Sequence, residues 1–161
     1  MSGVPSFAFL TFGSANDRRF AGWEAFRDSI RTGRPVGDDP PVDVPTWAAP
    51  PPPLGIWRLI AANNRELARS WSVYPHEQAA RNDVARLQRS VRSLVVTLIR
   101  GESASHYGWL ATLHGEPVVS SGRWFGAAST SLHSAETTLA DFASATATSE
   151  SPASAPGADG R

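Results

Sequence analysis

Short apolar runs recur along the chain and predict six β-strands, over residues 7–12, 57–62, 67–71, 94–99, 107–113 and 118–121. The run 94–99 is apolar or β-branched at almost every position, which indicates a strand covered on both faces. Asn63-Asn64 and His114-Gly115 separate consecutive strands, and both pairs suit tight turns because asparagine and glycine tolerate positive φ.

The first of three predicted helices follows the N-terminal strand. It is expected to begin at a cap formed by Ser14 or Asn16, with Asp17 in its first turn. Gly33 is a natural end for it. Its apolar face consists of Phe20, Trp23, Phe26 and Ile30.

Two further helices are predicted downstream. One opens at Pro75, where the missing backbone donor costs nothing, and ends near Arg92. Its apolar face consists of Ala80, Val84, Leu87 and Val91. The other is capped by Ser129, Thr130 or Ser131. Its apolar face consists of Leu132, Ala135, Leu139 and Phe142.

The distribution of proline divides the chain. Residues 34–55 hold eight of the thirteen prolines, four of them consecutive at 50–53, so this stretch is predicted to be an extended linker. From Ser144 onward the chain is mostly small and polar, and we expect disorder. The predicted organisation is an N-terminal strand and amphipathic helix (1–33), the linker (34–55), a folded domain (56–143) and a disordered tail (144–161).

The two halves of residues 56–143 match when Trp57 is aligned with Trp109. Each half has an aromatic strand, a polar turn, a short strand ending in serine, an aromatic residue and a helix. The other aligned positions are 67–70 with 118–121, and Tyr74 with Trp124 or Phe125. The predicted fold is therefore α+β: two tandem ββα-type repeats form one antiparallel sheet with helices packed on one face, and an extra N-terminal helix is added.

This pattern resembles the YegP-like family, small bacterial domains of unknown function, over roughly residues 57–142. The matching positions of the first unit are Trp57, Leu59, Ala61, Ala62, Asn63, Leu67, Ser70, Tyr74, Ala80, Val84 and Leu87. Asn64 stands where the family favours glycine, and His76 where it favours a helix-capping serine. The second unit is looser. The resemblance implies an antiparallel sheet with helices packed on it, and supplies no catalytic residue.

The sheet face turned away from the repeat helices is not fully polar, because Ile60 and Ala62 alternate with Leu59 and Ala61 along the first strand. A large apolar face is normally covered. We expect the N-terminal helix to cover it, since the linker is long enough to let that helix reach across. The alternative is self-association through this face.

Composition excludes several classes of chemistry. The chain has 161 residues, 41% of them hydrophobic, and a formal net charge of zero, which argues against a general attraction to nucleic acid or to an anionic membrane. It has no cysteine and no lysine, which removes thiolate nucleophiles, cysteine zinc sites and Schiff-base chemistry. No apolar run is long enough to span a bilayer, so the expected location is the cytoplasm.

Two segments approach catalytic motifs without completing them. Residues 76–80 begin like the zinc-protease HExxH motif, but Ala80 replaces the second histidine. Residues 101–105 approach the GxSxG nucleophile elbow, but Ser105 replaces the last glycine. The four histidines, which are not at metal-ligand spacings, are His76, His106, His114 and His133. We predict no catalytic residue, no metal site and no cofactor.

Three functions follow, in order of preference. The first is a non-enzymatic module that acts through an unidentified protein partner or through self-association, with prolines 50–53 serving as a spacer. The second is RNA binding through an arginine-rich helix face that consists of Arg81, Arg86, Arg89 and Arg92. The third is a hydrolase-type enzyme, which a pocket joining His106 or His114 to a carboxylate and a serine would indicate.

Overall fold

The computed structural model describes residues 4–42, 44 and 50–147. The strands are β1 (Ser6–Phe12), β2 (Arg34–Pro35), β3 (Leu54–Ile60), β4 (Glu66–Ser70), β5 (Leu94–Arg100), β6 (Tyr107–Leu113) and β7 (Glu116–Ser121). The helices are α1 (Arg18–Arg31), α2 (Glu77–Arg89), α3 (Ala128–Phe142) and a short 3-10 helix (Val91–Ser93). Part of the predicted linker, including residues 45–49, and the predicted tail from 148 lie outside the described residues.

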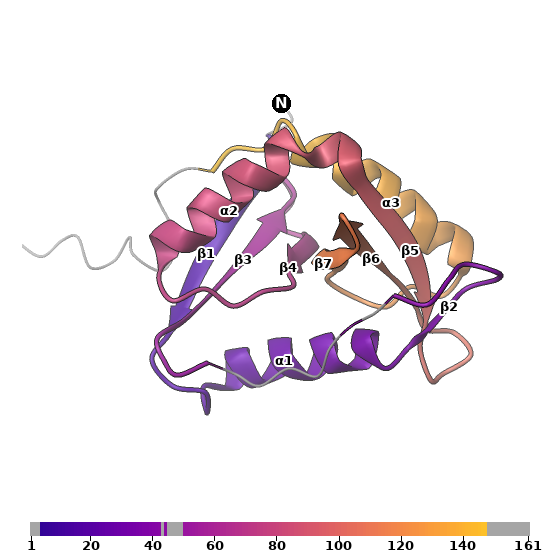
Figure 1. Ribbon diagram of the computed structural model, residues 1–161, viewed down its shortest axis with the longest axis horizontal. Coiled ribbons are helices and arrows are strands. Elements are labelled where there is room, and N and C mark those ends of the chain that lie inside the picture. The colour runs from indigo at the N-terminus through magenta and orange to yellow at the C-terminus, as the bar shows by residue number, and fades with distance from the viewer. Residues whose placement is uncertain (1–3, 43, 45–49, 148–161) are drawn as a thin grey trace, which may run out of the picture.

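All seven strands form one antiparallel sheet in the order β1-β3-β4-β7-β6-β5-β2 (Figure 1). The central pair, β4 and β7, joins the hairpins β3–β4 and β6–β7. The sheet therefore has more strands than the four that two ββα units would supply. The N-terminal strand β1 pairs with β3 along its whole length, so β1 belongs to the same sheet as the later strands.

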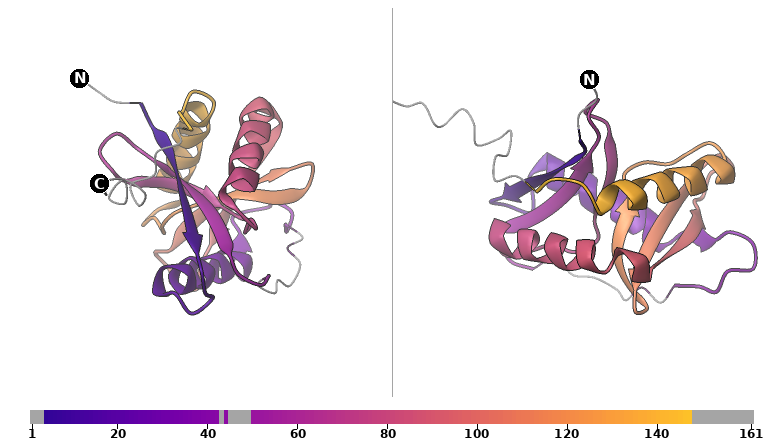
Figure 2. Two further views of the ribbon diagram at one scale, coloured as in Figure 1. Left: turned by 90° about the vertical axis from the view of Figure 1, so that its left-hand side faces the viewer. Right: turned by 90° about the horizontal axis from the view of Figure 1, so that it is seen from above.

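Helices lie on both faces of the sheet (Figures 1 and 2). α2 and α3 cover one face, where their buried residues pack around Trp57 and Trp109. α1 lies across the other face, and its buried apolar residues are Phe20, Trp23 and Ile30. The expectation that the N-terminal helix covers the second face is confirmed.

The α1 face contains two apolar clusters. One consists of Phe12, Phe20, Trp23, Leu54 and Ile56. The other consists of Ile30, Trp71, Ile99 and Leu110, and Val42 and Val44 of the proline-rich segment pack against it. The buried Arg27 links α1 to the segment after β4 through a hydrogen bond: its Nε–H donates to the Trp71 carbonyl at 2.7 Å. Burial lowers the pKa of Arg27 to about 10.

Strand β5 is covered less than its apolar sequence predicts. Thr97 and Ile99 are buried, but Val95 is 60% exposed. On the other side, β2 pairs only with Arg100 and Ile99 at the end of β5. The prediction of a strand covered on both faces is therefore wrong at its N-terminal half, because β5 lies near the edge of the sheet.

The caps of α1 and α2 differ from the expected ones. Asp17 caps α1 in place of Ser14 or Asn16, and its carboxylate accepts a hydrogen bond from the Arg19 backbone N–H at 2.9 Å. His76 caps α2 through its ring Nδ1, which accepts from the Ala79 N–H at 3.1 Å. The HExxH-like segment thus begins a helix.

Helix α3 presents a different face from the predicted one. Its buried residues are Ser131, Ala135, Thr138 and Phe142. Leu132, expected in the core, is 41% exposed. Ser131 is a buried residue of the helix and not its cap, since the helix follows Ala127 with no side-chain cap. The buried face of α3 therefore contains small and hydroxyl-bearing side chains, which the spacing of apolar residues does not identify.

The two hairpins share local features at the positions aligned from the sequence. The Trp57 N–H donates to Ser70 Oγ at 3.3 Å, and the Trp109 N–H donates to Ser121 Oγ at 3.2 Å. The strand register shifts after Leu59 in one hairpin and after Ala111 in the other. Both predicted turns contain a residue with positive φ, Asn64 at 72° and His114 at 52°.

The first residues of the predicted tail are ordered. The Phe7 N–H donates to the Thr146 carbonyl at 2.8 Å, and the Thr146 N–H donates to the Pro5 carbonyl at 3.0 Å. The Gln88 side chain binds the carbonyls of Phe142 and Ala145. The prediction of disorder from residue 144 is therefore wrong for residues 144–147, which lie against β1 and α2.

Candidate functional site

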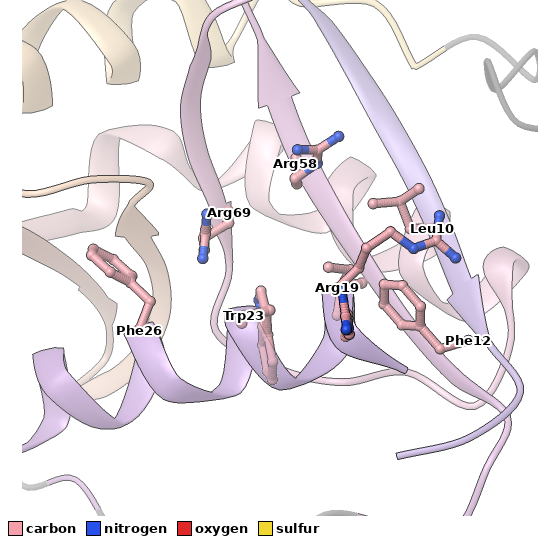
Figure 3. Close-up of a pocket in the computed structure, with 10 residues that line it drawn as sticks. Leu10, Phe12, Arg19, Trp23, Phe26, Arg58 and Arg69 are labelled. Atoms are coloured by element: carbon pink, nitrogen blue, oxygen red, sulfur yellow. The ribbon is translucent and has the colours of Figure 1, made fainter. Parts of the chain in front are cut away.

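A cleft of about 400 Å³ lies between α1 and the strands β1, β3 and β4 (Figure 3). We call it the arginine cleft. It is lined by Leu10, Phe12, Arg18, Arg19, Gly22, Trp23, Phe26, Ile56, Arg58 and Arg69. Its arginines come from two walls, Arg18 and Arg19 from the start of α1 and Arg58 and Arg69 from the sheet.

Strand alternation places the sheet arginines in the cleft. Arg58 lies directly opposite Arg69 in the register of β3 and β4. The residues on either side of Arg58, Trp57 and Leu59, belong to the core beneath α2 and α3. Because successive residues of a strand point to opposite faces, Arg58 points toward α1.

Arg69 is held on several sides. Its Nε and Nη2 donate to the two carboxylate oxygens of Glu66 at 2.6 and 3.0 Å, and Nη2 also reaches the Gly122 carbonyl at 3.3 Å. Its guanidinium carbon lies 5.0 Å from the centre of the Phe26 ring. A Cβ at Gly122 would lie 2.8 Å from the Glu66 carboxylate, so this arrangement needs glycine there. Arg69 is a fixed part of the cleft wall.

Arg58 is held loosely by comparison. Its one ion pair within the described chain is a 3.5 Å contact from Nη1 to Glu66 Oε1. Its Nε is buried and has no hydrogen-bond partner among the described residues. Its side chain is 36% exposed, against 14% for Arg69. Arg58 therefore retains hydrogen-bonding capacity that the fold does not use.

The outer wall of the cleft is the first turns of α1. Arg19, with 64% of its side chain exposed, pairs with Asp17 at 3.2 Å and lies over the Phe12 ring at 5.1 Å. The hydrogen bonds from Arg19 lower the pKa of the Asp17 carboxyl. Trp23 is buried at the base of this wall, and its ring N–H donates to the Ser70 carbonyl at 3.2 Å.

Gly22 leaves a bare patch on this wall. It is an exposed residue inside α1, and a Cβ built there would meet nothing within 4 Å. Glycine in a helix interior is less favourable than alanine by about 1 kcal/mol. No contact within the described structure requires glycine at this position.

The arginines of the predicted nucleic-acid face serve different purposes. Arg81 pairs with Glu77 at 2.6 Å, donates to the Ala147 carbonyl and lies over the Phe9 ring at 4.1 Å. Arg86 pairs with Asp83 at 2.8 Å. Arg89 and Arg92 are exposed at the end of α2 and in the following turn. The face therefore offers two exposed arginines without an ion pair among the described residues.

A second pocket brings together residues of hydrolytic type. It has a volume of about 310 Å³ and is lined by Ser29, Thr32, Glu102, Ser103, His106 and Trp124. The His106 ring is stacked on Trp124, with ring centres 5.5 Å apart. Within the part of the chain that the structure describes, no hydrogen bond joins this ring to a serine or to a carboxylate. The pocket holds the residue types of a hydrolase without the hydrogen-bonded pair that activates a nucleophile.

Other features add little chemistry. Across residues 4–42, 44 and 50–147, no group of three or more His, Cys, Asp or Glu side chains could hold a metal ion. No helix in the same residues is long and apolar enough to cross a membrane. His76 caps α2, and its ring is therefore already used by the fold.

Comparison with known proteins gives no relative for this chain: no family model, no curated protein and no solved structure matches it.

The sequence did not single out the arginine cleft. Alternation with Leu59 is enough to place Arg58 on the second sheet face, but its position opposite Arg69 requires the hairpin register. The contribution of α1 requires the packing of that helix on the sheet. One signal was present in the sequence: Gly22 interrupts the amphipathic pattern of the first predicted helix at a site with no turn or cap role.

Proposed function

We propose that the protein is a non-catalytic binding module that recognises a protein partner through the arginine cleft. The observation that carries this proposal is an open cleft whose walls combine arginines with apolar side chains and a bare helix surface at Gly22. Arginine and aromatic residues are enriched where proteins bind one another. The first turns of α1, which form the outer wall, are exposed.

RNA binding is the second candidate, because Arg89, at the end of α2, and Arg92, in the following turn, are exposed. α2 lies on the opposite face of the sheet from α1 (Figure 1). One experiment separates the two candidates. The full chain is immobilised and used to capture material from cells that contain it, with and without nuclease. Two variants are used in parallel: Gly22→Trp, which fills the cleft, and Arg89→Gln/Arg92→Gln, which removes the same type of charge elsewhere.

We expect a captured protein that remains bound after nuclease treatment, is retained by the α2 double variant and is lost from Gly22→Trp. Loss of the captured material with nuclease and with the α2 double variant would instead support RNA binding. Capture that Gly22→Trp leaves unchanged would show that the cleft is not the site.

We also propose that the sheet derives from two related units that meet at β4 and β7, as in the YegP-like family, and that the protein acts in the cytoplasm. The shared hydrogen bonds of Trp57 and Trp109 support related units. In this arrangement β1 flanks the first hairpin as β5 flanks the second.

A further inference from the structure

We infer that the arginine cleft receives an acidic segment of its partner, with a carboxylate beside Arg58 and the adjoining backbone over Gly22. This inference rests on the proposed function and adds the chemistry of what is bound. Two independent observations carry it, one on the sheet wall and one on the helix wall.

The sheet wall supplies the charge. Arg69 makes three hydrogen bonds, to Glu66 and the Gly122 carbonyl, whereas Arg58 has one contact at 3.5 Å and an unpartnered Nε. When the Arg58 guanidinium turns toward the cleft, its Nε–H and one Nη–H can both donate to the same acceptor group. A carboxylate matches this paired geometry, which Arg69 and Glu66 already display in the same cleft.

The charge balance favours an acid as well. Four arginines line the cleft, Arg18, Arg19, Arg58 and Arg69. The carboxylates that pair with them are Asp17 and Glu66. The cleft therefore carries an excess of positive charge on a chain whose formal net charge is zero. Complementary charge on the bound segment supplies orientation and speeds association.

The helix wall allows the backbone of a bound segment to approach α1 closely. Gly22 faces the cleft, and nothing in the described structure lies where its Cβ would be. Glycine weakens a helix, so packing within the molecule does not account for it. A bare helix surface lets another backbone lie against α1, and any side chain at position 22 would occupy that space.

The aromatic rings of the cleft argue against a nucleic acid as the occupant. Binding of single strands uses ring faces that are free to stack on bases. Here Trp23 is stacked on Phe20, Arg19 lies over Phe12 and Arg69 lies over Phe26. Trp23 and Phe12 are also buried. These rings form an apolar base suited to an aliphatic side chain.

The shape argues for a protein segment over a small molecule. Small-molecule sites enclose most of the ligand surface. The outer wall of this cleft consists of exposed residues, Arg18, Arg19 and Gly22, so an occupant remains open to solvent along one side. A partner chain can extend beyond the cleft on that side.

The test starts from a phage library of random dodecapeptides selected on the full chain. Enriched peptides are synthesised, and their affinities are measured by fluorescence anisotropy for the wild type and three variants. Arg58→Gln removes the charge, Gly22→Trp fills the cleft, and Arg89→Gln/Arg92→Gln is the matched control. All variants are first checked by thermal melting, where Gly22→Trp is expected to melt no lower than the wild type.

The expected result is enrichment of Asp or Glu next to an aliphatic residue. Affinity is expected to fall at least tenfold for Arg58→Gln and for Gly22→Trp, and to stay within about twofold for the control. Changing the acidic residue of the peptide to its amide is expected to cause a similar loss. An NMR signal of the Arg58 Nε–H that shifts on addition of the peptide, and does not shift with the amide peptide, supports the same contact.

Other outcomes overturn the inference in distinguishable ways. Non-acidic peptides that lose affinity only for Gly22→Trp would refute the acidic segment and leave protein binding at the cleft intact. No peptide affected by Gly22→Trp would refute both. Self-association of the chain that Gly22→Trp abolishes would identify a second copy as the occupant. Binding of a 20-nucleotide single-stranded RNA that Arg58→Gln weakens and the control does not would assign the cleft to nucleic acid.

Discussion

Arg58 and Arg69 face each other across two strands, and their surroundings give them different roles. Arg69 binds both oxygens of Glu66 and is mostly buried, so it shapes the cleft. Arg58 has an unpartnered Nε and one loose ion pair. Hydrogen-bonding groups that the fold leaves unused are the ones available to a partner. On the other face of the sheet, a buried hydrogen-bond network joins Trp57, Tyr74 and Asp83.

Tyr74 is the centre of that network. Its hydroxyl accepts a hydrogen bond from the Trp57 ring N–H at 3.3 Å and donates to the Asp83 carboxylate. Burial and the charge of Asp83 raise the pKa of Tyr74 above its ordinary value. We predict that Tyr74→Phe lowers the free energy of unfolding by about 1–3 kcal/mol at neutral pH, because it leaves a buried indole N–H without an acceptor.

The pH dependence of this effect has a definite sign. Because the pKa of Tyr74 is higher in the folded state than in the unfolded state, its contribution is complete below pH 10.0 and declines as pH rises above that value. The free energy of unfolding in urea is measured for the wild type and for Tyr74→Phe at each pH. The difference between the two proteins is free of the contribution of other groups, such as Arg27. A difference between the two proteins that stays constant through this range would contradict the assigned pKa direction.

At the scale of elements, alternation and helical spacing predicted most of the secondary structure. The turns at Asn64 and His114 were predicted because asparagine and glycine tolerate positive φ. The position of α1 was predicted because the second face of the sheet is apolar and needs a cover. The predicted buried face of α3 was wrong, because Ser131 and Thr138 are buried and their hydrophobicity does not predict burial. The one strand that was not predicted is β2, because it has only two residues and lies in the proline-rich stretch. The place of β1 in the sheet was also not predicted, because its partner β3 follows the proline-rich stretch.

The pairing of β1 with β3 allows a test of the covering role of α1. Phe12 lies opposite Leu54 at the end of this strand pair, so an Asn-Gly turn can replace residues 13–53 and close a hairpin. We predict that this shortened chain exposes the apolar clusters on the α1 face, binds a hydrophobic dye and self-associates. Dye fluorescence and light scattering measure both effects.

A synthetic peptide of residues 14–33 serves as the control in that experiment. Added in excess, it is expected to reduce dye binding to the shortened chain, because α1 regains its place on the sheet. A shortened chain that stays monomeric and binds no dye would show that α1 is not needed to cover this face.

At the scale of the whole molecule, charge and packing are distributed unevenly over the two faces. The face beneath α2 and α3 contains the largest core, around Trp57 and Trp109. The α1 face contains two smaller clusters and, between α1 and β1, β3 and β4, the arginine cleft. A neutral chain that gathers arginines at one opening can attract an acidic partner there without a general attraction to polyanions.

Photo-crosslinking in living cells is the most direct test of partner binding at the arginine cleft. A photoreactive amino acid is placed at position 18, an exposed arginine on the rim of the cleft, and at position 89 as a control on the opposite face. We predict a protein adduct from position 18 that Arg58→Gln reduces, and no such adduct from position 89. Adducts from position 89 alone, or nucleic-acid adducts at either position, would contradict it.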